Sequence, residues 1–341
     1  MSIYALYPTF IRPCIFALDA ETAHSLTIKL GHLLSKPMLT TLFAQQVEAR
    51  PLELMGLKFK NPLGLAAGMD KNGEAIDFLG ALGFGHLELG TVTPRAQAGN
   101  PKPRMFRIKP ARGLINRMGF NNKGVDYLVR NLLARRYQGV VGVSIGKNET
   151  TPLEQALDDY LICLSKVYNC CDYVAVNISC PNTPGLTALQ EAEPMEHLIS
   201  GIKAERDKLA ASTRRYVPLV VKIAPDLTDT QLQALCAICL KHQIDGISCT
   251  NTTTKRDLIT GMPHAGEWGG LSGEPLRTQS TKVLAAVKAQ VGDKIPLIGI
   301  GGIDGPIAAR EKLNAGAQLL QLYSAFVYQG PQIIQDIVEN I

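Results

Sequence analysis

The sequence predicts an α/β protein: a (β/α)8 TIM barrel with an amphipathic helical extension at its amino terminus. From Asn61 onward, eight short apolar runs alternate strictly with eight segments of helical periodicity, which favours a barrel. Before that point, apolar residues recur at i, i+3, i+4 and i+7, which favours surface helices. A doubly wound parallel sheet is the alternative architecture for the alternating part.

The amino-terminal residues predict two short amphipathic helices, which form an extension spanning residues 1–40. One apolar face runs from Ile3 to Leu18 and continues from Ala23 to Leu34. We expect Pro13 to separate the helices, because a proline inside a helix costs about 3 kcal/mol. The pair could cap the main domain or lie in a membrane interface, and the pattern fits both. No signal peptide, transit peptide or transmembrane span is evident.

Residues 41–341 are expected to form the barrel, a length that one barrel core can hold. The strand-like runs are 62–67, 86–92, 140–146, 172–179, 218–224, 245–250, 295–300 and 318–323. The helix candidates are 74–82, 125–136, 153–168, 194–209, 229–242, 275–291, 306–314 and 332–341. An insertion at 93–123, with a strand-like run at 104–109, is expected to lie over the barrel mouth.

The positive charge of the chain is concentrated in this insertion. The 341 residues are 46% hydrophobic and 19% charged, which excludes a disordered protein or a coiled coil. The net charge is +5, yet Leu89 to Val125 holds eight basic residues and no acidic one, against 27 basic and 30 acidic residues elsewhere. A basic stretch of this length indicates an anionic partner, although for most of these side chains a solvated loop is the favoured interpretation. The stretch lacks repeated aromatic residues, so no nucleic-acid partner is expected.

Reactive polar residues and glycines follow the predicted strands at their carboxyl ends, where barrel enzymes carry their chemistry. They are Lys71, Thr91, Ser144, Lys147, Asn177, Cys180, Asn182, Lys222, Thr250, Asn251, Thr252, Gly301, Gly302, Tyr323 and Ser324. The run 299–304 has Asp304 where a dinucleotide fingerprint needs its third glycine, so we interpret it, with Tyr323 and Ser324, as a phosphate cradle. The sequence therefore predicts a phosphate-bearing cofactor.

Neither a metal site nor a disulfide is predicted. The six histidines are scattered, and the pair Cys236 and Cys239 lies in an apolar helical segment without a second pair at metal-ligand spacing. The eight cysteines are expected to be free thiols. One alternative stays open from the residues alone: a phosphate-binding lyase that uses Lys222 or Lys71 as a Schiff-base amine.

Seven motifs make the chain resemble dihydroorotate dehydrogenase over nearly its whole length. Among them are NPLGLAAGMDK at 61–71, NRMGFNN at 116–122 and NISCPNTPG at 177–185. The others lie at 221–226, 250–253, 270–273 and 299–304. The helix pair further resembles the membrane-associated, quinone-using branch of this family, in which it shapes a quinone tunnel. The resemblance implies oxidation of (S)-dihydroorotate to orotate in pyrimidine biosynthesis, with a quinone as the final electron acceptor.

The resemblance also implies one FMN per chain and assigns residues to it and to the substrate. The FMN-binding residues would be Ala67, Gly68, Met69, Asp70, Lys71, Thr91, Ser144, Asn177, Lys222, Thr250, Gly273, Gly302, Tyr323 and Ser324. The dihydroorotate-binding residues would be Lys71, Asn116, Arg117, Met118, Gly119, Phe120, Asn177, Asn182, Asn251 and Thr252. The enzyme would associate peripherally with the cytoplasmic face of a bacterial cell membrane.

Two residues depart from the pattern of the quinone-using branch. Cys180 stands at the position of the catalytic base, where that branch usually has serine and the soluble class 1 enzymes have cysteine. A thiol, whose reference pKa is about 8.5, is a more effective base near neutral pH than a hydroxyl. Ser144 stands where relatives often have an asparagine that contacts FMN. A soluble class 1 enzyme that uses fumarate or a partner subunit is therefore the alternative.

Overall fold

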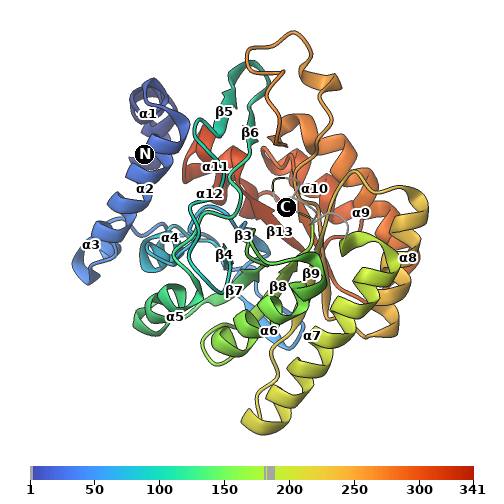
Figure 1. Ribbon diagram of the computed structural model, residues 1–341. Coiled ribbons are helices and arrows are strands. Elements are labelled where there is room, and N and C mark those ends of the chain that lie inside the picture. The colour runs from blue at the N-terminus through green and yellow to red at the C-terminus, as the bar shows by residue number, and fades with distance from the viewer. Residues whose placement is uncertain (1–2, 180–181, 183–188) are drawn as a thin grey trace.

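The eight predicted strands close into one parallel barrel (Figure 1). The computed structural model describes residues 3–179, 182 and 189–341. Around the barrel the strand order is β10, β12, β13, β3, β4, β7, β8, β9. Their bounds are β3 Leu63–Leu65, β4 His86–Val92, β7 Val140–Ile145, β8 Tyr173–Asn177, β9 Leu219–Ile223, β10 Gly246–Cys249, β12 Leu297–Ile300 and β13 Leu319–Leu322. The predicted (β/α)8 barrel is confirmed, and the doubly wound sheet is wrong.

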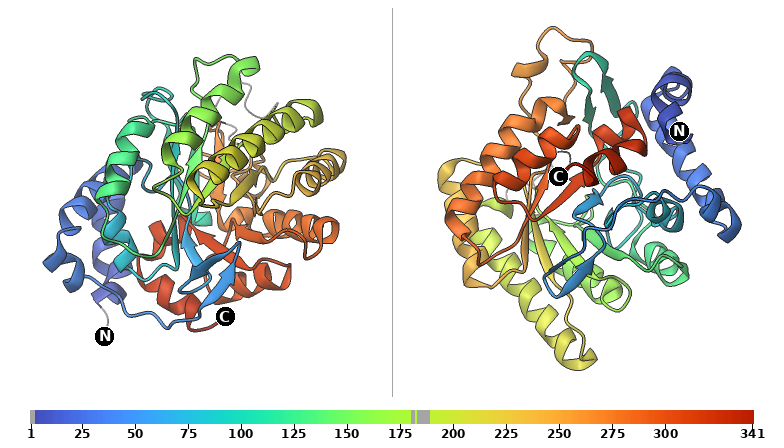
Figure 2. Two further views of the ribbon diagram at one scale, coloured as in Figure 1. Left: turned by 90° about the horizontal axis from the view of Figure 1, so that it is seen from below. Right: turned by 180° about the vertical axis from the view of Figure 1, so that it is seen from behind.

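Helices surround the barrel on its outer side (Figure 2). They are α4 Ile76–Ala81, α5 Val125–Ala134, α6 Ala156–Val167, α7 Ala192–Thr213, α8 Asp229–Lys241, α9 Arg277–Val291, α10 Pro306–Asn314 and α12 Gln332–Val338. Short turns, η4 Leu153–Gln155 and η7 Glu274–Leu276, precede α6 and α9. Each agrees with a predicted helix. The sequence analysis missed α11 Ser324–Gln329, because its six residues continue the apolar run of the last strand.

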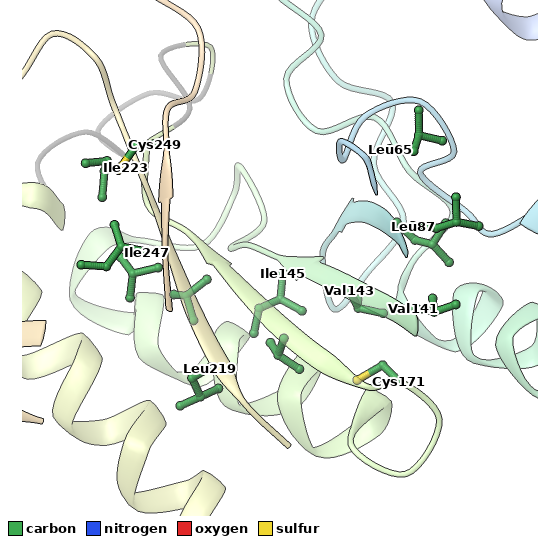
Figure 3. Packing of buried hydrophobic residues seen from close by; sticks show 14 of the residues in the cluster. Leu65, Leu87, Val141, Val143, Ile145, Cys171, Leu219, Ile223, Ile247 and Cys249 are labelled. Atoms are coloured by element: carbon green, nitrogen blue, oxygen red, sulfur yellow. The ribbon is translucent and has the colours of Figure 1, made fainter. Parts of the chain in front are cut away.

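The main core lies between the barrel strands and the surrounding helices. Side chains such as Leu87, Val141 and Leu219 are completely buried there (Figure 3). Parallel strands covered on both faces carry near-continuous apolar runs, which explains why they could be recognised in the sequence. This packing holds the carboxyl ends of all eight strands at one rim.

The insertion forms an antiparallel sheet beside that rim. Its strands are β5 Met105–Ile108, β6 Gly113–Asn116 and β11 Gly270–Gly273, with β6 in the centre. The run predicted at 104–109 is therefore a strand, whereas β6 and β11 were not predicted. A separate hairpin, β1 Leu52–Leu54 with β2 Leu57–Phe59, precedes the barrel. The turns η3 Lys109–Ala111 and η6 Asp257–Ile259 lie in the connecting loops.

The predicted break of the extension at Pro13 is wrong. The chain is helical from Ile3 through Ala17, as η1 Ile3–Leu6, η2 Tyr7–Ile11 and α1 Arg12–Ala17, and Pro13 lies in the first turn of α1. A proline there loses no intrahelical hydrogen bond. The break falls at Asp19 instead, whose Oδ1 accepts hydrogen bonds from the backbone N–H groups of Glu21 and Thr22 and so starts α2 Ala20–Leu34. A third helix, α3 Pro37–Leu42, follows.

The extension lies along one side of the barrel, where α2 contacts α4 and β5 (Figure 1). A buried ion pair connects it to the insertion: Arg104 Nε and Nη2 donate to the two carboxylate oxygens of Glu21 at 3.0 and 2.7 Å. Arg107 Nη1 also donates to the Leu18 carbonyl at 2.7 Å. Large apolar side chains of the extension stay exposed, including Phe10, Leu26, Leu30, Leu33, Met38 and Leu42.

Candidate active site

A cavity opens at the rim formed by the carboxyl ends of the strands. It encloses about 1280 Å³ of empty space, including the part open to solvent, which is ample for a ligand larger than a drug-sized molecule. Most of the predicted site residues line it: Ala67, Gly68, Lys71, Thr91, Asn116, Met118, Gly119, Phe120, Asn177, Asn182, Lys222, Thr250, Asn251, Thr252, Gly273, Gly302, Tyr323 and Ser324. Residues far apart in the sequence therefore meet at one place.

Four predicted residues do not line the cavity: Met69, Asp70, Ser144 and Arg117. The Asp70 carboxylate accepts hydrogen bonds from the backbone N–H groups of residues 74 and 75, so it shapes the loop after β3. Ser144 Oγ lies 2.8 Å from Thr91 Oγ1 and so supports a lining side chain from behind. Cys180, the predicted base, lies outside the described residues.

Arg117 is held away from the cavity by its own contacts. Its Nη1 donates to Glu267 Oε2 at 2.6 Å, and its guanidinium lies over the rings of Phe106 and Trp268. Through these contacts the guanidinium of Arg117 holds the insertion against the loop before β11. The expectation that Arg117 closes over an anionic ligand is not supported by this arrangement.

Part of the charge of the insertion is neutralised within the protein, because four of its eight basic residues, Arg117 included, form ion pairs. Lys102 and Arg104 pair with Glu21, and Lys123 pairs with Glu74. Of the eight basic residues, all of which the structure describes, Arg112 lines the cavity. The sequence could show that the charges cluster, but the carboxylates that pair with them come from distant segments.

Asparagine side chains form a hydrogen-bonded group on one wall of the cavity. Asn177 Nδ2 donates to Thr91 Oγ1 at 2.8 Å, and Asn251 Nδ2 donates to Ser179 Oγ at 3.0 Å. Asn182 Nδ2 donates to Asn116 Oδ1 at 3.1 Å, while Asn182 Oδ1 is buried without a hydrogen-bond partner among the described residues. A buried carbonyl oxygen in this state favours a ligand that brings an N–H group.

Lys222 lies at the floor of the cavity and is fixed from below by Glu88. Its Nζ is 3.2 Å from Glu88 Oε1, and Glu88 Oε2 accepts hydrogen bonds from Tyr173 and Gln321 at 3.1 and 2.9 Å. Burial opposes ionisation of Glu88, but the charge of Lys222 and the hydrogen bonds lower the pKa of this carboxyl below its ordinary value. The cavity therefore has a fixed positive charge at its floor.

Glu88 was missed by the sequence analysis, although the sequence holds a signal for it. The residue is a carboxylate inside the apolar run 86–92, and a buried charge on a strand needs a partner of opposite sign. Lys222 lies on β9, two strands beyond the neighbouring β7. The pairing itself depends on barrel closure, which no single segment reveals.

The glycine loop after β12 fits a phosphate group. Gly302 has φ +70°, and a Cβ at this position would lie 2.3 Å from the Arg277 Cα, so only glycine allows the loop to run this close to α9. Ser324 Oγ lies 2.8 Å from Ser272 Oγ at the same end of the cavity. Exposed backbone N–H groups in such a loop are suitable donors to phosphate oxygens.

The extension reaches the opposite wall of the cavity. Ala20 of α2 packs with Met105 and Met118, and both methionines line the cavity. Tyr328, another lining residue, contacts the ring of Phe16 in α1. Burial, followed by the charge of Lys71, lowers the pKa of His24 in α2 to about 3, so this imidazole is neutral near pH 7. The extension therefore packs behind this wall of the cavity, against apolar and aromatic side chains that line it.

The described part of the chain contains neither a candidate metal site nor a candidate membrane-spanning helix. Residues 3–179, 182 and 189–341 contain no group of three or more His, Cys, Asp and Glu side chains that could hold a metal ion. Within the same residues, every helix is too short or too polar to cross a membrane.

Comparisons with known proteins agree with the geometry. Residues 51–341 match the family described as dihydroorotate dehydrogenase. A dihydroorotate dehydrogenase (quinone) of Photobacterium profundum is 54% identical over 329 residues, covering 96% of this chain and 98% of the relative. The enzyme of the same name from Enterobacter sp. (strain 638) is 53% identical over 336 residues, covering 98% of this chain and 100% of the relative.

Solved structures show the same relationship. A crystal structure of DHODH from Eimeria tenella in complex with ferulenol has a TM-score of 0.87 and 33% identity, covering 96% of this chain and 93% of that one. The ligand-free form of the same enzyme has a TM-score of 0.84 and 32% identity, covering 94% of each chain. Since both the family match and the close relatives span most of its length, the chain belongs to the dihydroorotate dehydrogenase family.

Proposed function

We propose that this protein oxidises (S)-dihydroorotate to orotate, with FMN as the hydride acceptor and a quinone as the final electron acceptor, in pyrimidine biosynthesis. One observation carries the proposal: residues from seven of the eight strand ends, all except β7, meet in a cavity with a glycine loop at one end and a fixed cation at its floor. The membership in the family and the names of the relatives support it.

The residues present fit FMN, one molecule per chain. The loop at Gly302, with Tyr323 and Ser324, would bind the phosphate. The residues assigned to the rest of the cofactor are Ala67, Gly68, Lys71, Thr91, Asn177, Lys222, Thr250 and Gly273, all of which line the cavity. Met69, Asp70 and Ser144 would act indirectly, by shaping the loop after β3 and by supporting Thr91. When bound, FMN supplies an acceptor for a hydride.

Different side chains of the cavity would bind the substrate and take part in its oxidation. The asparagines at 116, 177, 182 and 251 would hold the ring N–H and C=O groups of dihydroorotate through their amides. Lys71 would bind the carboxylate. Cys180 would take the proton from C5 while a hydride leaves C6, so that the C5–C6 bond becomes the double bond of orotate. Lys222 would stabilise negative charge at the cofactor end.

Replacing Cys180 by alanine tests the assigned base. We expect the variant to bind FMN normally but to lose flavin reduction by dihydroorotate by about 100-fold or more, because general base catalysis typically supplies that factor. Stopped-flow absorbance of the bound flavin measures this step alone. A Cys14→Ala variant, which changes an exposed cysteine of α1, is the matched control. Fast flavin reduction in the Cys180→Ala variant would contradict the assignment.

The extension is proposed to deliver the quinone and to associate with the membrane, residues 1–40 forming this unit and residues 41–341 the catalytic barrel. Its exposed apolar side chains suit the apolar region of a bilayer, and on its inner side Ala20 and Phe16 contact side chains that line the cavity. Peripheral association with the cytoplasmic face of a bacterial membrane follows as part of the same proposal.

An acceptor assay on a chain lacking residues 1–38 separates the possible electron acceptors. We expect the full chain to use a ubiquinone analogue rather than fumarate, and the truncated chain to lose quinone turnover while keeping flavin reduction by dihydroorotate. In the steady state, the absorbance of a dye measures quinone turnover and the absorbance of orotate measures oxidation of dihydroorotate. Turnover with fumarate would indicate a soluble class 1 enzyme, which Cys180 favours, and a purified protein without a flavin spectrum would indicate the lyase.

A further inference from the structure

A lysine is buried directly beneath the glycine loop, outside the set of residues considered so far. Lys312 lies on α10 and is completely shielded from solvent. Its Nζ donates to Ser280 Oγ, and it lies 3.4 Å from the carbonyl oxygen of Arg277. Ser280 Oγ in turn donates to the carbonyl oxygen of Gly301 at 2.9 Å. The ammonium group is thus connected to the loop through one hydroxyl.

Nearby carboxylates are already engaged by another cation. Arg277 of α9 binds Glu311 through Nε and Nη2 at 2.8 and 2.7 Å, and its Nη1 lies 3.6 Å from Asp304. Among the described residues, Lys312 forms no ion pair of its own. The remaining ionisable neighbour is the buried thiol of Cys249 on β10. An ammonium group without a counter-ion is expensive to bury.

In these surroundings, whether Lys312 is charged near pH 7 depends on the groups around it. Burial lowers its pKa to about 7, with Cys249 and Glu311 opposing that change and Arg277 reinforcing it. An anion arriving at the loop would favour the charged form and raise this pKa. The phosphate proposed for this position is such an anion.

The hydrogen bond from Ser280 also fixes the direction of one peptide group. In a trans peptide the C=O and the following N–H point in opposite directions. Because the carbonyl of Gly301 points down to Ser280, the N–H of Gly302 points away from α9, and Gly302 lines the cavity. The lysine therefore supports a donor aimed toward the ligand.

We propose that Lys312 is a positioning residue for the phosphate site: it holds the Gly301–Gly302 peptide through Ser280 and supplies the buried counter-charge for the phosphate. This inference rests on the proposed function, in which the cavity binds FMN. It assigns no contact between Lys312 and the reacting atoms. Its effect is confined to ligands that carry a phosphate group.

A comparison of FMN with riboflavin, which lacks the phosphate, tests the proposal. The apoprotein of the Lys312→Met variant is titrated with each flavin, and quenching of flavin fluorescence gives the dissociation constants. We expect FMN to bind about tenfold more weakly or worse than to the unchanged chain, while riboflavin affinity stays within about twofold. Lys282→Met, which removes an exposed lysine of α9, controls for net charge and should leave both affinities unchanged.

The unfolding of the apoprotein separates this role from a structural one. Because a buried unpaired charge is replaced by an apolar side chain of similar length, the Lys312→Met apoprotein should unfold at the same temperature as the unchanged chain or higher. Equal loss of FMN and riboflavin affinity, together with lower thermal stability, would show a structural role and overturn the proposal. Unchanged FMN affinity would overturn it as well. If the unchanged chain binds no FMN, the proposed function itself fails.

Proton uptake gives a readout that does not depend on the Lys312 variant folding. Calorimetric titration of the unchanged apoprotein with FMN near pH 8, in two buffers of different ionisation enthalpy, should show uptake of part of a proton, and FMN affinity should fall as the pH rises above about 7. Ser280→Ala, which keeps the charge but breaks the connection to Gly301, should weaken FMN more than riboflavin. No proton uptake and equal affinities in Ser280→Ala would contradict the proposal.

Discussion

Lys222 and Glu88 show how a single buried pair supports the chemistry of the cavity. Under the proposed function the lysine would supply the charge that a reduced cofactor needs, and the carboxylate holds that charge in one position from below. The carboxylate is completely buried and accepts hydrogen bonds from three donors, so both charges are compensated. Removing either partner alone leaves the other buried and unpaired.

A double-mutant cycle on the apoprotein measures this dependence. We expect Glu88→Gln to lower the free energy of unfolding by about 3 kcal/mol, because it leaves Lys222 as an uncompensated buried charge. Glu88→Gln combined with Lys222→Met should recover much of that loss. Urea unfolding followed by circular dichroism gives the values, with Glu53→Gln on the exposed face of β1 as the control. Additive effects of the two changes would argue against a coupled pair.

The individual site residues were predictable where a strand end gave their position. Thr91, Asn177 and Lys222 follow recognisable apolar runs, and all three line the cavity. Arg117 was assigned on its motif, but its guanidinium is occupied by Glu267 and two aromatic rings. The partner of a side chain comes from elsewhere in the chain, and local sequence does not contain that information.

At the scale of elements, the attachment of α2 depends on one buried carboxylate. Glu21 is 7% exposed and Arg104 is 6% exposed, and their two hydrogen bonds join the extension to β5 and the loop before it. Arg104 also donates to the carbonyls of Ala98 and Asn100, so its position in the insertion is independent of Glu21. The pair is therefore the connection that a change in the extension can break.

The variant Glu21→Gln tests whether this attachment matters for electron transfer to the quinone. Loss of one partner of a buried pair weakens docking of α2, so we expect quinone turnover to fall roughly fivefold or more. Flavin reduction by dihydroorotate, measured by stopped flow, should keep its rate because the strand ends are untouched. Glu53→Gln serves as the control. A parallel loss of both rates would mean that the pair supports the barrel rather than the extension.

The helix boundaries in the extension could not be predicted from the apolar pattern of the sequence. Proline is expected to break a helix, yet Pro13 falls in a first turn, where its missing N–H has no cost. The true boundary is marked by Asp19, a residue type that favours the first position of a helix. The pattern correctly predicted helices in this segment. It did not predict that a π-helical turn at Tyr7–Ile11 leads directly into α1.

At the scale of the whole molecule, surface charge and apolar surface are separated. Four of the eight basic residues of the insertion form ion pairs with carboxylates of the protein, whereas large exposed apolar side chains gather on the extension. Association with a membrane would then depend on apolar burial rather than on attraction to anionic lipids. These two driving forces respond differently to salt.

Vesicle sedimentation distinguishes the two forces. We expect the protein to bind neutral phosphatidylcholine vesicles, with binding that changes less than about twofold when salt is raised to 0.5 M, because apolar burial is not screened. Leu26→Gln with Leu30→Gln should weaken binding, since both side chains are half exposed on α2. Leu133→Gln, which changes a still more exposed leucine on α5, is the control. Binding that requires anionic lipid would contradict this prediction.

The barrel, its helices and the lining residues at the strand ends could be predicted from local sequence, whereas others, such as Asn116, Phe120 and Gly273, were assigned through the family resemblance. The predictable features are local: buried parallel strands are apolar runs of characteristic length, and functional residues follow their carboxyl ends. Which charges pair depends on the tertiary structure, as for Glu88 with Lys222 and Glu21 with Arg104, and so does the burial of Lys312 without a carboxylate partner among the described residues. Such pairings join side chains from distant segments, because barrel closure and docking of the extension bring them together in space.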